Sequence, residues 1–143
     1  MKHTFCLAAL ILAFATGCTS VSVKPVAAGK ELRAVSIVEN PKVKVADFVD
    51  VLVAGFARHG INAKVVKTED EAKNEYMVTY VAYRKWDMAP YLCDATINMT
   101  KDGQTVATAT YHLMGGGGLS PAKWNGTKSK IDPVIDQLLE HYN

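Results

Sequence analysis

The stretch "YLCDATINM" (Tyr91 to Met99) decides the fold, because apolar and polar residues alternate along it. Every second residue from the first to the last is apolar, whereas Asp94, Thr96 and Asn98 lie between them. Successive side chains of a strand point to opposite faces of a sheet. The stretch is therefore predicted to be a strand with one packed face and one solvated face.

Strands are also predicted on both sides of this stretch. The segment "YMVTYVAYRKW" (Tyr76 to Trp86) alternates before it, and "QTVATATYHLM" (Gln104 to Met114) alternates after it. The sequence Lys101-Asp102-Gly103 is typical of a tight hairpin turn. These three strands are predicted to form an antiparallel meander.

A strand, a helix and a second strand are predicted before the meander. The β-branched residues of "ELRAVSIVE" (Glu31 to Glu39) favour a strand, and "INAKVVK" (Ile61 to Lys67) favours another. Between them, Phe48, Leu52 and Phe56 recur at helical spacing. The segment resembles a βαβ unit, whose two strands can be parallel.

A second helix is predicted at the carboxyl end, where Ile131, Ile135, Leu138 and Tyr142 form one apolar stripe. Pro133 is expected in its first turn, where a proline is tolerated. The order of elements is then β-α-β-β-β-β-α. This order predicts an α+β domain, with one mixed sheet of about five strands and two helices packed on one face.

The segment between the last strand and this helix is predicted to be a flexible loop. It begins with four glycines, Gly115 to Gly118, which give the backbone unusual freedom. It lacks the G-x-x-x-x-G-K-[ST] pattern of a phosphate-binding loop. No phosphate site is predicted here.

The amino-terminal segment indicates export from the cytoplasm. Lys2 and His3 precede an apolar run from Phe5 to Phe14, which is about half the ~20 residues that a membrane-spanning helix needs. A basic start, a short apolar run and small residues at its end are typical of a secretory signal peptide. Residues 1–17 are assigned to it.

The end of this segment, Ala15-Thr16-Gly17-Cys18, resembles the lipobox of bacterial lipoproteins. The resemblance implies a diacylglyceryl group on the Cys18 thiol, cleavage after Gly17 and acylation of the new amine, with fatty acids such as palmitate. An ordinary signal peptide cut near Gly17 is the alternative. A thiolate is a strong nucleophile, which suits this chemistry.

The lipid also implies a location. One acyl chain binds a membrane only marginally, whereas two or three hold a protein there. In the enterobacterial sorting pattern, Asp after the lipidated cysteine favours the inner membrane, and here Thr19 follows Cys18. The resemblance therefore implies the outer membrane, facing the periplasm, with inner-membrane anchoring as the alternative.

The chain after the signal is divided into a linker and a domain. Residues 18–30 are predicted to be the lipidated cysteine and a flexible tether, because they are small and polar with one proline and one glycine. Pairing of Val21 and Val23 with a sheet edge is the alternative. Residues 31–143 are predicted to be the periplasmic domain.

The composition excludes several classes of function. The net charge is only +2 and no run of Lys or Arg occurs, so no nucleic-acid partner is expected. Cys93 alone remains once Cys6 leaves with the signal and Cys18 takes the lipid, so no internal disulfide is possible. Its place in the alternating pattern predicts a buried Cys93 rather than a nucleophile.

No catalytic, metal or cofactor site is predicted. His59, His112 and His141 show no metal-ligand spacing, and no nucleophile, acid and base converge. A polar site of His112 with Asp94 or Asn98 across the sheet is the alternative. The chain is therefore predicted not to be an enzyme.

An interaction surface is predicted at the connection "RKWDMAPYL" (Arg84 to Leu92). Aromatic residues, Met and Arg are enriched at interfaces, and this connection holds Trp86, Met88 and Tyr91. Trp124 in the glycine-rich segment is added to the set. The alternative is that these side chains only close the end of the core.

In its order of elements the chain is similar to small periplasmic lipoproteins of Gram-negative bacteria, including the two-helix, one-sheet lipoproteins that assist envelope assembly. This likeness is topological. We therefore expect a non-enzymatic, lipid-anchored protein that binds or supports an envelope component, either a protein or a lipid. The alternative is a carrier that holds a small apolar ligand or lipid between sheet and helices.

Overall fold

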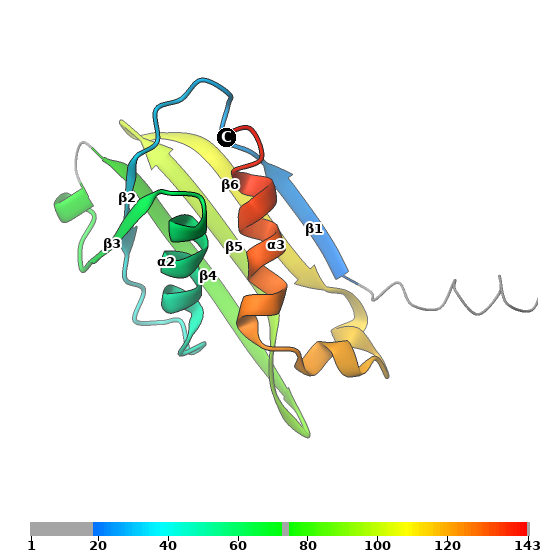
Figure 1. The fold of residues 1–143 in the computed structure, drawn as a ribbon. Helices are drawn as coiled ribbons and strands as arrows, with labels where there is room; N and C mark the ends of the chain where they lie inside the picture. The colour runs from blue at the N-terminus through cyan, green and yellow to red at the C-terminus, as the bar shows by residue number, and fades with distance from the viewer. Residues whose placement is uncertain (1–18, 73–74, 143) are drawn as a thin grey trace, which may run out of the picture.

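The computed structural model describes residues 19–72 and 75–142, so the predicted signal peptide and Cys18 lie outside the described residues. Two α-helices cover one face of a six-stranded mixed sheet (Figure 1). The α+β class is confirmed, with one strand more than predicted. The elements are β1 (Thr19–Lys24), β2 (Ala34–Val38), α2 (Phe48–Arg58), β3 (Asn62–Val66), η2 (Asp70–Ala72), β4 (Tyr76–Asp87), β5 (Ala89–Lys101), β6 (Gln104–Leu113), η3 (Met114–Gly117), η4 (Pro121–Trp124) and α3 (Thr127–Leu138).

The sheet has the strand order β1-β6-β5-β4-β2-β3. Strands β4, β5 and β6 are antiparallel neighbours, which confirms the meander. Strand β2 is parallel to both β3 and β4. The segment β2-α2-β3 is thus a βαβ unit, as predicted, and the structure shows that its strands are parallel.

Strand β1 corrects the prediction of a flexible tether. It pairs antiparallel with β6 over its whole length, with Val21 opposite Tyr111 and Val23 opposite Ala109. The alternation of valine with serine puts both valines on the packed side and satisfies the backbone groups of β6. Val26 is also buried and donates a backbone hydrogen bond of 2.9 Å to Leu138. Residues 19–24, predicted to belong to a tether, are therefore part of the sheet.

The core lies between the helices and the sheet. On the helical side, α2 buries Phe48, Leu52 and Phe56, and Phe48 stacks on Tyr80 of β4 with ring centroids 5.3 Å apart. The apolar face predicted for this helix is confirmed. The open face of the sheet is largely polar, as the alternation predicted.

Helix α3 begins earlier than predicted. Gly126 has an extended backbone at the N-cap, and the helix starts at Thr127. Pro133 consequently lies in the second turn, not the first, where it removes one helical hydrogen-bond donor.

Two connections also differ from the predictions. The connection between the strands predicted to end at Trp86 and to begin at Tyr91 is shorter than expected, because the turn is reduced to Met88, which has a φ of 59°. The glycine-rich segment, predicted to be a loop, contains the short turns η3 and η4, and η3 has left-handed backbone at Gly115 and Gly116. Gly117 is required there, because a Cβ would lie 2.7 Å from Cβ of Lys123.

Candidate functional site

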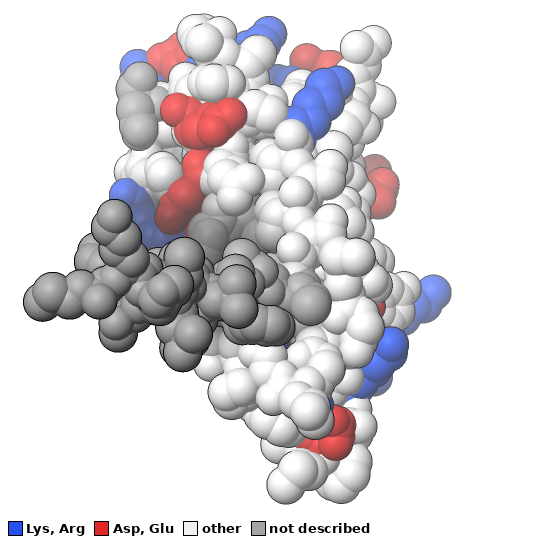
Figure 2. All heavy atoms as spheres, turned by 90° about the vertical axis from the view of Figure 1, so that its right-hand side faces the viewer, with Lys and Arg blue, Asp and Glu red and all other residues white. Residues whose placement is uncertain are grey.

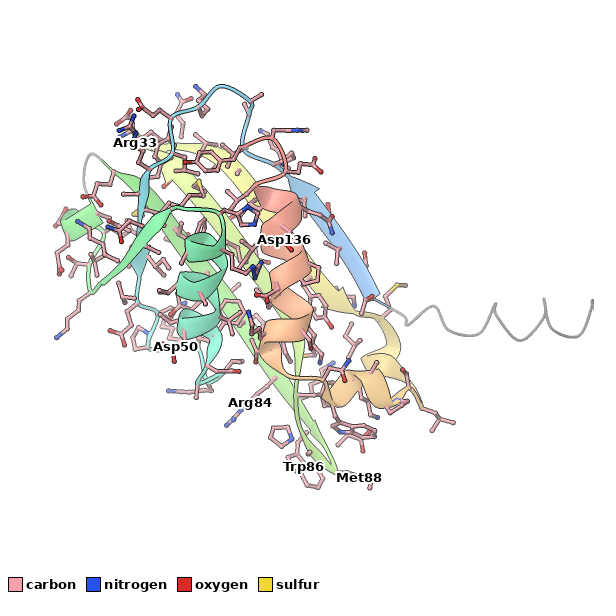
Figure 3. The ribbon with its side chains drawn as sticks, in the orientation of Figure 1. Arg33, Asp50, Arg84, Trp86, Met88 and Asp136 are labelled. Atoms are coloured by element: carbon pink, nitrogen blue, oxygen red, sulfur yellow. The ribbon has the colours of Figure 1, made fainter. Side chains whose placement is uncertain are left out.

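The end of the β4–β5 hairpin and the η3–η4 segment expose four large apolar side chains. Trp86 is 76% exposed, Met88 81%, Met114 52% and Leu119 fully. Figure 3 shows Trp86 and Met88 at the far end of the hairpin, away from both helices. We call these four residues the apolar rim. Exposed apolar side chains gathered at one end of a molecule are typical of an interaction surface.

A polar layer beneath the rim fastens η4 to the hairpin. The ammonium group of Lys123, which is buried, forms an ion pair with the Asp87 carboxylate and donates to the Gly118 carbonyl at 3.0 Å. The Trp124 indole donates to the Asp87 carbonyl at 2.7 Å. These contacts hold two segments of the chain together at the end of the sheet.

A second buried lysine comes from α3. Lys130 of α3 donates to the carbonyls of Leu92 at 3.1 Å and Lys123 at 2.5 Å. Burial lowers the pKa of Lys130. The Tyr91 ring lies near both ammonium groups, with its centroid 5.9 Å from Lys123 Nζ and 5.8 Å from Lys130 Nζ. Lys130 thus bridges backbone carbonyls of β5 and η4, whereas Lys123 joins the Asp87 carboxylate to the Gly118 carbonyl.

The structure separates the residues predicted for the interaction surface. Trp86 and Met88 are exposed, as that prediction required. Tyr91 is buried and closes the end of the core, so the prediction was wrong for this residue. Trp124 is 37% exposed, about half as much as Trp86, because its indole is tied to the hairpin.

The sequence reasoning missed Met114, Leu119 and the two buried lysines. The burial of Lys130 could have been predicted, because Lys130, Val134 and Leu138 are spaced at i, i+4 and i+8. Lys130 therefore falls within the apolar stripe of the helix. No sequence pattern predicts the exposure of Leu119, since a single leucine after four glycines has no periodic neighbours.

A pocket of about 240 Å³ opens between α3, η4 and the edge formed by β1 and β6. Its walls are largely apolar. Tyr111 lines it, and the buried Tyr111 hydroxyl has no hydrogen-bond partner among the described residues. Burial raises the pKa of this hydroxyl. The lining residues are Thr19, Val21, Tyr111, Leu113, Gly117, Ser120, Ala122, Lys123, Asn125, Ser129, Lys130 and Pro133.

The open face of the sheet carries the alternative polar site. His112 Nδ1 contacts the Asp94 carboxylate, and Thr108 donates to Asn98 at 2.7 Å. The pKa of Asp94 is lowered: burial raises it, but the hydrogen bond with His112 and further contacts outweigh burial. A partly exposed acid–histidine pair on a flat face can bind a polar group. Ser20 of β1 lies opposite His112 in the register of this face.

Cys93 lies on the opposite face and is buried, as predicted. Its thiol donates to the Tyr83 carbonyl at 3.3 Å, and burial raises the pKa of the thiol. A thiol in this state is a poor nucleophile. Within residues 19–72 and 75–142, no three His, Cys, Asp or Glu side chains are grouped to hold a metal ion.

Within the part of the chain that the structure describes, no helix is long and apolar enough to cross a bilayer.

Comparisons with known proteins find similarity only in structure. No family model matches the chain, and no curated protein matches it. A dodecamer of a single-residue variant of PelC from Paraburkholderia phytofirmans has a TM-score of 0.60 and 14% identity, covering 83% of this chain and 97% of that chain. The PelC dodecamer from the same organism has a TM-score of 0.56 and 13% identity, covering 86% and 96%. The chain is therefore similar in fold to PelC.

Proposed function

We propose that this chain is a non-enzymatic lipoprotein, anchored in the outer membrane by lipid on Cys18 and facing the periplasm, where it supports an envelope component. One observation carries the proposal: the apolar rim lies on the side of the molecule where the described chain begins. The lipid and the rim would then engage the same bilayer.

The geometry of β1 supports this arrangement. Thr19 pairs with Leu113, which directly precedes Met114 of the rim. The hairpin extends further, since Met88 lies six positions before Asp94, which is at the level of β1, and six steps of strand span about 20 Å. The start of β1, the η3–η4 segment and the hairpin end lie along the lower right-hand side in Figure 1. A lipid on Cys18 would hold this side against the membrane, because no tether separates it from β1.

The character of this side suits a lipid surface. Figure 2 views it directly, and the lower part is mostly uncharged, with few charged groups near the hairpin. Fully burying one large apolar side chain contributes about 1.5–3 kcal/mol. Partial burial of four such chains would be comparable with a short acyl chain at about 0.8 kcal/mol per methylene. Arg84 and Lys85 are exposed beside Trp86 and can pair with anionic headgroups.

The supported component would meet the parts of the molecule that remain in the periplasm. The open face of the sheet, with its His112–Asp94 pair, is one such surface. The similar PelC structures are dodecamers. We therefore include further copies of this chain among the envelope components that it binds, a step that light scattering of the detergent-solubilised protein would test.

A carrier of a small apolar ligand is the second candidate function. The pocket beside β1 is the specific observation that favours it. Its volume of about 240 Å³ is below the range of ~300–1,000 Å³ of typical ligand pockets. It has room for part of one acyl chain and not for a whole membrane lipid, so we rank the carrier second.

The anchor is tested by mass spectrometry and membrane fractionation of three full-length forms. The natural chain and Cys6→Ser, a matched control within the signal, should both begin at residue 18, carry acyl mass and stay with washed outer membranes. Cys18→Ser should lack acyl mass and be released by washing. Retention of Cys18→Ser on the membranes, with no acyl mass on the natural chain, would refute the anchor.

The rim is tested by fluorescence, because the chain has only two tryptophans. The lipidated Trp124→Phe protein is inserted into phosphatidylethanolamine–phosphatidylglycerol vesicles with brominated acyl chains. We expect strong quenching of Trp86, and much weaker quenching of Trp124 in the Trp86→Phe protein. Equal, weak quenching of both would refute membrane contact by the rim and leave the anchor standing.

A further inference from the structure

The pocket beside β1 lies next to the predicted lipidation site in the chain. Thr19 and Val21 of β1 form part of its wall. Thr19 is the residue that follows Cys18, so a group attached to Cys18 is joined to the chain within about 4 Å of the Thr19 backbone. Such a group has a high effective concentration at the pocket, as in any intramolecular binding.

The walls of the pocket favour an apolar occupant. Val21, Leu113, Ala122 and Pro133 contribute apolar surface from four different elements. Although two lysines also line the pocket, their ammonium groups are engaged with Asp87 and with backbone carbonyls. The methylene stems of the lysines add to the apolar lining. An anionic ligand would find no free cation of the lining, whereas a hydrocarbon chain would find a matching surface.

Tyr111 supplies a second and independent indication. It is 3% exposed, and its hydroxyl has no hydrogen-bond partner among the described residues. A buried hydroxyl without a partner is unfavourable. The ester or amide carbonyl at the head of an acyl chain is an acceptor of the kind that this donor lacks. An apolar chain with a carbonyl at one end therefore fits both the walls and the unpaired group.

We propose that this pocket receives one acyl chain of the lipid on Cys18 itself. The inference rests on the proposed lipidation. The volume of about 240 Å³ equals about eight water-sized groups of ~30 Å³, so it holds part of a single chain. Since burial of methylenes is favourable both in the pocket and in the bilayer, the remaining chains keep the protein on the membrane. The chain in the pocket fixes the orientation of the folded body beside the anchor.

Photocrosslinking of the lipid within the same molecule tests this proposal. Cells that express the full chain are supplied with palmitate carrying a diazirine, and the purified lipoprotein is irradiated in phosphatidylethanolamine–phosphatidylglycerol vesicles. Peptide mass spectrometry then locates the acyl group. We expect intramolecular adducts on the peptides of η4 and the first two turns of α3.

Two matched substitutions decide whether the pocket makes these adducts. Ala122→Trp fills the pocket from an exposed position, and Lys128→Trp adds the same side chain at an exposed position outside the lining. The intramolecular adducts should fall at least fivefold in Ala122→Trp and stay unchanged in Lys128→Trp. Ser129→Phe, also in the lining, gives a second test if Ala122→Trp does not fold.

The other outcomes separate the two proposals. Acyl mass on the natural protein with adducts only to vesicle lipids would overturn the pocket proposal and leave the anchor intact. Absence of acyl mass would overturn the anchor first. Stoichiometric phospholipid in purified Cys18→Ser would also overturn the pocket proposal, because the occupant would then be an external lipid and the protein a carrier.

Discussion

Helices α2 and α3 lie side by side on the same face of the sheet, but they are packed in different ways (Figure 1). The half under α2 is filled by large apolar side chains, among them Leu52 and Phe56, both fully buried. The half under α3 also has an apolar stripe, but it includes the buried Lys130, a pocket and the unpaired hydroxyl of Tyr111.

The difference indicates which half is free to serve a function. The α2 half has a filled core, whereas the α3 half has a pocket and a buried hydroxyl without a partner. Natural proteins depart from close packing and full hydrogen bonding mainly at functional sites. Helix α3, the η3–η4 segment and the start of β1 lie on the same side of the molecule, and residues of all three line the pocket (Figure 1). We therefore assign stability to the α2 half and the proposed contact with lipid or a partner to the α3 half.

Phe56→Ala should have the largest effect on stability. It removes a fully buried aromatic side chain from the α2 half, and such changes typically cost about 3–5 kcal/mol in the free energy of unfolding. Urea unfolding of the unlipidated Cys18→Ser form, followed by circular dichroism, measures it. Val65→Ala on the partly exposed edge strand is the control and should cost far less. A loss below ~1 kcal/mol for Phe56→Ala would contradict the role given to this half.

Lys130→Met should cost less, about 1–3 kcal/mol, because it leaves the carbonyls of Leu92 and Lys123 without this donor while keeping an apolar side chain. Lys128→Met, on the exposed side of the same helix, should change the free energy of unfolding by less than ~0.5 kcal/mol. If Lys130→Met cost as much as Phe56→Ala, the two halves would not differ as described.

The pH dependence of the free energy of unfolding tests the burial of Lys130 separately. Burial holds the pKa of Lys130 in the folded chain below its ordinary value of 10.5, so the unfolded chain binds more protons between the two values. The free energy of unfolding of the natural residue should therefore rise, relative to Lys130→Met, as the pH increases through the folded pKa toward 10.5. A relative fall over this range would contradict the burial of a charged Lys130.

Tyr111→Phe should have an effect whose sign depends on the lipid. In the unlipidated Cys18→Ser form it removes a buried hydroxyl without a partner, so we expect a gain of about 1 kcal/mol. In the lipidated protein, where an acyl carbonyl would accept from this hydroxyl, the gain should vanish or become a small loss. Thermal unfolding of both forms in the same detergent measures the difference, and an equal gain in both would contradict a lipid carbonyl at Tyr111.

The α2 half and the meander were the parts that the sequence predicted well. Their signals are periodic: Phe48, Leu52 and Phe56 at helical spacing, and alternation from Tyr91 to Met99. Such patterns are local consequences of having one packed face. The exposure of Trp86 and Met88 was also predictable, because an aromatic hairpin end has few partners to cover it.

The α3 half was predicted less well, because its structure depends on contacts between distant segments. Strand β1 is too short and polar to be recognised alone, and only pairing with β6 makes it a strand. The burial of Tyr91 depends on Lys123 and Lys130, which the fold brings to it from 32 or more residues away in the chain. Such contacts leave no period in the sequence.

A substitution in the ion pairs between α2 and α3 should have the smallest effect on the free energy of unfolding. Asp136 of α3 contacts Arg58 at 2.5 Å and His59 at 2.8 Å, both at the end of α2. Burial would raise the pKa of Asp136, but the hydrogen bonds from His59 and Arg58 outweigh it and hold the pKa below 3.8. Because this carboxylate is about half exposed, the ion pairs should stabilise the fold by less than ~1 kcal/mol.

The sign of the pH effect follows from the lowered pKa. The stabilisation is fully present above the unfolded value of 3.8 and is lost as the pH falls through the folded pKa. Asp136→Asn should therefore lower the free energy of unfolding slightly at pH 7 and flatten its decline in acid, whereas Glu69→Gln, an exposed carboxylate outside both helices, serves as control. An acid decline that is unchanged in Asp136→Asn would show that the halves are joined by apolar contacts alone, among them the packing of Ile135 against Gly55.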